Sequence, residues 1–138
     1  MRALLVLPML FFVSTPDWAS QWLSFGEGGN GQFSISIDLD SIQRKGSHIT
    51  VWERFTYNKP VKHTGGRFIH VIKSHQSYDC DQRSTLLLHG FAYADANSTV
   101  ALDTINYSDR PSNYSTVTPS SIEERILNLV CSDSLATR

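Results

Sequence analysis

The sequence contains few cysteines, no excess of either charge and no long apolar run beyond its first residues. Of 138 residues, 2 are cysteine, 12 are basic and 13 are acidic, so the net charge is −1. Nucleic-acid binding requires a basic footprint that this chain lacks. After the N-terminal region no apolar run is long enough to cross a bilayer, and we expect no transmembrane segment.

Motifs that hold a cofactor or a metal are also missing. The stretch from Gly26 to Gly31 is rich in glycine, but no Gly-Lys-Ser/Thr ending and no helix follow it, so it predicts a hairpin turn. The cysteines form no Cys-x-x-Cys pair, and His70 and His75 would point to opposite faces of a strand. We therefore expect no metal and no cofactor.

No catalytic motif stands out in the chain. A Gly-x-Ser-x-Gly elbow, which would present a nucleophilic serine, is absent. We expect that the protein is not an enzyme. A Ser-His-Asp site assembled by folding is the alternative, because such sites are recognised by geometry and not by sequence order.

The N-terminal region has the features of an export signal. Arg2 precedes an apolar run from Ala3 to Val13, and small and polar residues follow it up to Ser20. This pattern predicts a signal peptide over residues 1–20 and a single domain over residues 21–138. No cysteine that could accept a lipid follows the run. We expect an exported protein, located in the periplasm, at the cell surface or secreted.

Two cysteines in an exported chain most often form a disulfide. We expect a bond between Cys80 and Cys131, with a free buried pair as the alternative. Such a bond would close a loop of about 50 residues and constrain the unfolded chain by roughly 4 kcal/mol in the entropic model.

Alternating apolar and polar residues predict an antiparallel sheet with one wet face. The clearest stretch runs from Phe33 to Asp40. Strands are predicted over residues 21–25, 33–40, 48–57, 68–76, 83–93 and 99–105. The consecutive Leu86, Leu87 and Leu88 predict a strand covered on both faces, and Gly90 predicts a bulge or a close contact.

One segment, from Ser120 to Cys131, has helical periodicity. Its apolar residues Ile122, Ile126, Leu129 and Val130 form one stripe. The sequence allows two N-terminal caps for this helix. One is Thr118, followed by proline at the first helical position, and the other is Ser121, with Glu124 completing a capping box. A helix this short must dock onto the sheet. The predicted fold class is α+β, with about six antiparallel strands and one C-terminal helix tied by the disulfide.

Several short motifs occur in a familiar order. Trp22 opens the mature chain, residues 37–42 read Ile-Asp-Leu-Asp-Ser-Ile, Val51 precedes Trp52, and residues 78–80 read Tyr-Asp-Cys. A Pro-Ser-Ser turn precedes the final helix. Over residues 22–131 the chain resembles the surface-adhesin protein E family of Gram-negative bacteria. The resemblance implies an envelope location, binding of host proteins and a homodimer as one assembly. A soluble periplasmic accessory protein without a host ligand is the alternative.

Two loops are candidate surfaces for a protein partner. The first, predicted over Asn58 to Arg67, gathers cations and glycines. The second, predicted over Asn106 to Thr118, carries aromatic and arginine residues of the kind that anchor interfaces. The candidate binding residues are Lys59, Lys62, His63 and Arg67 in the first loop and Tyr107, Arg110 and Tyr114 in the second.

Overall fold

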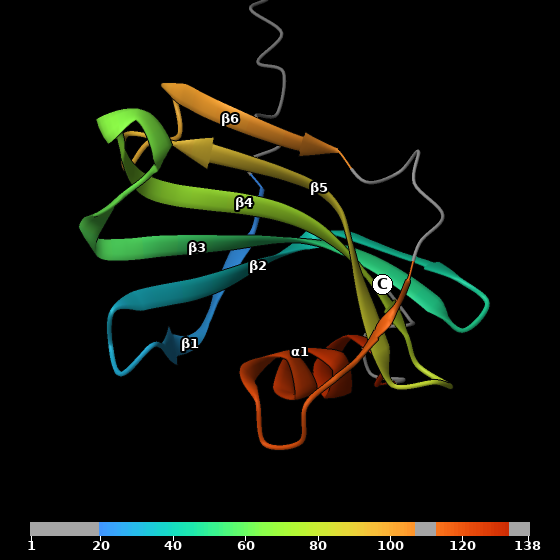
Figure 1. Cartoon of the computed structure of the whole chain (residues 1–138). Coiled ribbons are helices and arrows are strands. Elements are labelled where there is room, and N and C mark those ends of the chain that lie inside the picture. The colour runs from blue at the N-terminus through green and yellow to red at the C-terminus, as the bar shows by residue number, and fades with distance from the viewer. Residues whose placement is uncertain (1–19, 107–112, 133–138) are drawn as a thin grey trace, which may run out of the picture.

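An antiparallel sheet with one helix against one of its faces makes up the fold (Figure 1). The structure is a computed structural model that describes residues 20–106 and 113–132. The strands are β1 (Trp22–Gly28), β2 (Phe33–Lys45), β3 (His48–Lys62), β4 (Phe68–Asp79), β5 (Ser84–Tyr93), β6 (Ala101–Asn106) and β7 (Ser115–Thr116), and the helix is α1 (Ile122–Val130). Strands β1 to β6 pair in chain order, and the short β7 pairs with β5. The predicted fold class is confirmed.

The alternation along β2 decides which face of the sheet is buried. Ile35 and Ile37 are fully buried, and in register they oppose Phe55 and Glu53 of β3. Serines at positions 34 and 36 point the other way, because successive side chains of a strand alternate between faces. The hairpin turn predicted over Gly26 to Gly31 is confirmed only in its second half, because β1 continues to Gly28 and pairs there with Phe33 of β2.

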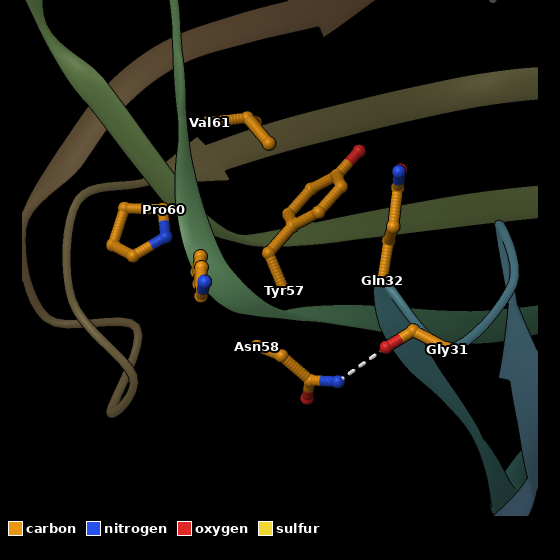
Figure 2. A pocket seen from close by; sticks show the side chains of 7 residues that line it. Gly31, Gln32, Tyr57, Asn58, Pro60 and Val61 are labelled. Atoms are coloured by element: carbon orange, nitrogen blue, oxygen red, sulfur yellow. Dashed lines mark hydrogen bonds between the residues drawn. The ribbon is translucent and has the colours of Figure 1, made fainter.

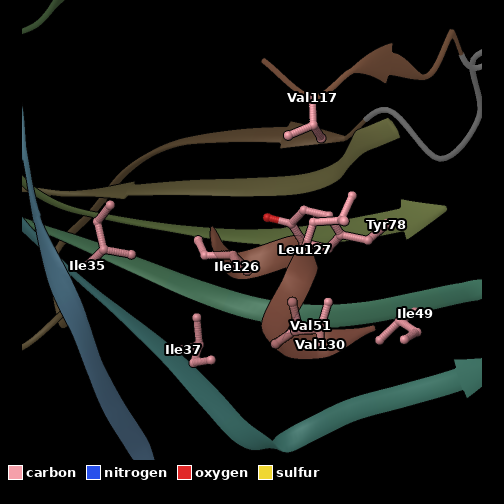
Figure 3. Close-up of a cluster of buried hydrophobic side chains, with 9 residues drawn as sticks. All are labelled: Ile35, Ile37, Ile49, Val51, Tyr78, Val117, Ile126, Leu127 and Val130. Carbon is pink, nitrogen blue, oxygen red and sulfur yellow. The ribbon is translucent and has the colours of Figure 1, made fainter. Parts of the chain in front are cut away.

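The core lies between α1 and strands β2, β3 and β4 (Figure 3). The buried side chains of Ile126, Leu127 and Val130 come from the helix. They face side chains of the sheet and of the segment before the helix, namely Ile35, Ile37, Ile49, Val51, Tyr78 and Val117. Each large side chain buried in this way contributes about 1.5–3 kcal/mol.

The disulfide joins the end of the helix to the end of β4. Cys80 and Cys131 are bonded, with their Cα atoms 5.8 Å apart, and both border the core cluster. The expected pairing is therefore confirmed. The bond holds a helix of only nine residues, which could not persist alone, against the sheet.

Of the two caps considered for the helix, the structure has the one at Ser121. The backbone N–H of Glu124 donates to Ser121 Oγ at 3.1 Å, and Glu124 Oε2 accepts from the backbone N–H of Ser120 at 2.7 Å. The Thr118 alternative is wrong, because Pro119 and Ser120 form the turn before the helix. The pKa of Glu124 is lowered by this backbone hydrogen bond and by Arg83.

The prediction of a loop over Asn58 to Arg67 is wrong in its first half. Strand β3 continues to Lys62, and the backbone N–H of Asn58 donates to the carbonyl oxygen of Gln32. Pro60 is tolerated because the pairing of β3 with β4 shifts between Thr56 and Val61. Proline occurs in sheets at irregular positions of this kind. Only the short 3-10 turn η1 (Thr64–Gly66) separates β3 from β4.

The prediction that Leu86, Leu87 and Leu88 are covered on both faces is also wrong. All three are half-buried, because the core beneath α1 takes no residue from β5. Gln76 pairs with Leu87 and His75 pairs with His89, so the extra residue of a bulge is Leu88. The predicted irregularity exists, but it lies two residues before Gly90.

Among the described residues, no helix is long and apolar enough to cross a membrane.

Candidate partner-binding site

The first candidate cluster lies where β3 turns into β4. The backbone N–H of His63 donates to the carbonyl oxygen of Arg67 at 2.7 Å and closes the turn. Arg67 Nη1 donates to the carbonyl oxygen of Leu102 at 3.0 Å, and His63 Nε2 lies 3.2 Å from Asp103 Oδ2. Two of the four predicted residues are thus held against β6.

The cluster contains a contact between His63 and Asp103 and two exposed lysines. The pKa of the Asp103 carboxyl is lowered, first by the backbone N–H of Thr104 and then by His63. Lys59 and Lys62 are exposed at the end of β3, and neither forms an ion pair within residues 20–106 and 113–132. These two lysines are the cations that remain available to an acidic partner.

A hollow of about 570 Å³ lies beside Lys59. It is lined by the turn before β2 and by the end of β3, that is by Gly31, Gln32, Tyr57, Asn58, Lys59, Pro60 and Val61. Tyr57 and Gln32 point to the same side, whereas Pro60 points away from them (Figure 2). Asn58 Nδ2 donates to the carbonyl oxygen of Gly31 at 2.5 Å and braces the two segments. Pockets with a few placed polar groups among apolar walls are typical of ligand sites.

The second candidate cluster is only partly described. Tyr107 and Arg110 lie outside the described residues. Tyr114 is half-buried, its hydroxyl lies 2.8 Å from Ser77 Oγ, and its ring meets that of His48 edge-on at 5.6 Å. Tyr114 therefore packs over the sheet.

The two clusters lie at opposite ends of the same strand. His48, beside Tyr114, begins β3, and Lys62 ends it. A strand of 15 residues spans roughly 45 Å at about 3.3 Å per residue. One small ligand cannot touch both clusters, so they are separate candidate surfaces.

A row of rings on the face away from α1 was not predicted. Trp52 stacks on His75 with ring centroids 4.8 Å apart, and His75 stacks on His89 at 5.8 Å. The Arg54 guanidinium lies 4.6 Å from the Trp22 ring on the same face. Burial, and then the neighbouring His89, lowers the pKa of His75. Trp52 lies on this face because side chains alternate along β3, but its partners follow from cross-strand register.

The sequence matches a known protein family, and the fold is similar to solved structures. Residues 22–132 match the model of the family described as surface-adhesin protein E. A structure of Haemophilus influenzae protein E is similar with a TM-score of 0.59 at 11% identity, over 92% of this chain and 96% of that chain. A crystal structure of protein E from non-typeable Haemophilus influenzae gives a TM-score of 0.60 at 11% identity, over 89% and 83%.

At this identity the structural matches show a shared fold. A comparison with curated protein sequences finds no match. The family match covers every strand, the helix and both cysteines, and the solved structures have the same architecture. The chain belongs to the surface-adhesin protein E family.

Proposed function

We propose that this chain is a non-enzymatic, exported, adhesin-like protein that binds a protein partner at the end of the β3–β4 hairpin. The observation that carries the proposal is that Lys59 and Lys62, beside the hollow at Tyr57, form no ion pair within the part of the chain that the structure describes. Exposed cations steer an acidic partner, and a partly apolar hollow can bury one of its side chains. The partner class is a host extracellular-matrix or serum protein, in keeping with a family of surface adhesins.

The surface around Tyr114 is the second candidate for the same function. A contact there would include Tyr107 and Arg110, which belong to the same segment of the sequence. The Tyr114 hydroxyl already forms a hydrogen bond with Ser77 Oγ, and its ring contacts that of His48. Less of this side chain is therefore available to a partner. The β3–β4 end is therefore the favoured surface.

Export and assembly belong to the proposal as well. Residues 1–20 act as a signal peptide, and residues 21–138 form the exported domain. The family match from residue 22 to residue 132 fits this division. The exported domain is either a monomer or a homodimer. Sedimentation of the purified protein would distinguish the two.

The test is binding of the exported protein to immobilised matrix and serum proteins. We expect wild type to bind at least one of them, and the variant Lys59→Glu/Lys62→Glu to bind at least tenfold more weakly because two attractive charges become repulsive. Lys45→Glu is the matched control, since Lys45 is exposed at the far end of the β2–β3 hairpin. Equal loss in both variants, or in neither, would contradict the assignment of this surface.

The alternative is a periplasmic accessory protein without a host ligand. It is favoured by the absence of a lipid-accepting cysteine after the apolar run. Fractionation of the producing cell separates the two functions. Recovery of all the protein in the soluble periplasmic fraction, with none accessible to protease on intact cells, would support the accessory role.

A further inference from the structure

Helix α1 covers only part of the sheet face against which it lies. Its core contacts come from β2, β3 and β4, whereas Ile72, Leu87 and Ala92 lie on the same face further along. These three residues line a second hollow of about 250 Å³. Its walls are almost entirely apolar.

The hollow exists because two neighbouring positions carry little side chain. Ser74 of β4 pairs with Gly90 of β5, and Ile72 pairs with Ala92. A glycine and an alanine opposite longer residues leave space above the sheet, since each strand position contributes one side chain to a face. The described part of the chain does not fill this space with any other element.

One polar group in this hollow lacks a partner among residues 20–106 and 113–132. Ser74 is only 5% exposed, it lines the hollow, and its Oγ forms no hydrogen bond with any of these residues. Leaving a buried hydroxyl unpaired costs free energy, because the group has lost its hydrogen bonds to water and gained none in the protein. A ligand that brings a hydrogen-bonding atom to Ser74 recovers this free energy, whereas a purely aliphatic group leaves the hydroxyl unpaired.

The rim of the hollow belongs to the candidate binding site. His63 and Asp103, which lie 3.2 Å apart, both border it. Two exposed apolar side chains flank the same hairpin: Val61, whose strand partner Ile69 lines the hollow, and Phe68, which is 55% exposed. An apolar pocket inside a rim of polar and apolar side chains is the arrangement found around energetically dominant interface residues.

We propose that this hollow is the anchor pocket for a single tyrosine or tryptophan side chain of the protein partner, whose polar tip pairs with Ser74. This inference rests on the proposed function. An apolar cavity of about 150 Å³ holds benzene, and drug-sized ligands occupy about 300–1,000 Å³, so the volume suits one substituted ring. Buried tyrosine and tryptophan need a partner for their O–H or N–H group, which phenylalanine and leucine lack.

The test uses two soluble probes that differ by one hydroxyl group. N-acetyl-tyrosinamide and N-acetyl-phenylalaninamide are titrated into the purified exported protein, and NMR shifts report their dissociation constants. We expect the tyrosine derivative to bind about tenfold more tightly, the value of one buried hydrogen bond. In Ser74→Ala this preference should disappear. That variant removes an unpaired buried group, so its fold should be retained.

A second variant tests the location of the pocket. Ala92→Phe fills the hollow and should abolish binding of both probes, whereas Thr104→Phe adds the same ring to the opposite face of β6 and should leave binding unchanged. The pocket proposal is overturned if neither probe binds, if Ala92→Phe binds normally, or if Ser74→Ala keeps the preference. It is also overturned if Ala92→Phe still binds the partner that wild type binds. Failure of the proposed function is a separate result, namely that wild type binds no matrix or serum protein while the probes still bind.

Discussion

Tyr78 donates its phenolic O–H to Glu53 Oε1 over 2.5 Å inside the core. Glu53 is 2% exposed, and its strand position lies among the apolar residues that face α1. Burial raises the pKa of the Glu53 carboxyl to about 7, although the hydrogen bond from Tyr78 opposes the shift. Burial and the Glu53 charge also raise the pKa of Tyr78. The core thus contains a carboxyl group that takes up a proton near neutral pH.

This carboxyl group should make stability depend on pH. Its pKa is 4.5 in the unfolded chain and about 7 in the folded protein, so the folded state binds more protons between these values. The contribution is fully present below pH 4.5 and is lost as pH rises through 7, by at most about 3 kcal/mol. Urea unfolding at a series of pH values measures the effect.

Glu53→Gln is the control for that experiment, because it keeps the acceptor for Tyr78 and removes the titration. The difference in the free energy of unfolding between wild type and Glu53→Gln should favour the variant above pH 7 and shrink towards pH 4.5. Using the difference cancels the exposed carboxyls of Asp95 and Asp103, whose lowered pKa values act in the opposite direction. Parallel stability curves for the two proteins would contradict the prediction.

Removing the disulfide should destabilise the fold strongly. Cys80→Ser/Cys131→Ser releases a loop of 51 residues, which the entropic model values at about 4 kcal/mol. The urea midpoint of the variant should fall to that of reduced wild type. Reductant should lower the urea midpoint of wild type and leave that of the variant unchanged. A shift in both midpoints would show that the reductant acts on something other than this bond.

The helix cap gives a smaller, local prediction. Ser121→Ala removes the acceptor for the Glu124 N–H and should lower the free energy of unfolding by about 1 kcal/mol. Ser121→Asp supplies another acceptor and a favourable charge at the helix N-terminus, so it should keep wild-type stability. Equal stability of all three proteins would mean that docking alone holds the first turn.

Partner association should depend on salt through two side chains. For wild type, the association rate should fall between 50 and 300 mM salt, which are about the concentrations over which screening becomes strong. In Lys59→Gln/Lys62→Gln this dependence should be weaker, and in Lys45→Gln it should equal that of wild type. Surface plasmon resonance on the bound partner measures these rates. A salt dependence unchanged in the double variant would remove both lysines from the contact.

Local patterns in the sequence predicted the features that depend on residues close together in the sequence. The alternation from Phe33 to Asp40 identified strand β2 and its buried face, and the Ser121–Glu124 spacing was one of two predicted caps, the one that the structure has. The end of β3 was missed because Pro60 normally interrupts a strand. Here the pairing on either side of it, at Asn58 and Val61, holds the chain extended.

The candidate site was predicted less completely because it depends on register. No local signal shows that Arg67 reaches Leu102 or that Trp52, His75 and His89 share one row. The hollow above Ser74 depends on Gly90 lying opposite it and on a helix that does not extend that far. These are relations between segments that lie far apart in the sequence.

Because α1 covers only part of the sheet, substitutions can change ligand recognition separately from the stability of the fold. The residues that hold the helix and those that line the hollow share only strand β4 among these examples, and they are different residues: Val51 and Tyr78 contact the helix, whereas Ile72 and Ala92 line the hollow. A substitution at Ala92 can therefore change which ligand binds without destabilising the part of the sheet that the helix and the disulfide hold. One scaffold can acquire a new ligand by changes at a few positions while its folding remains untouched.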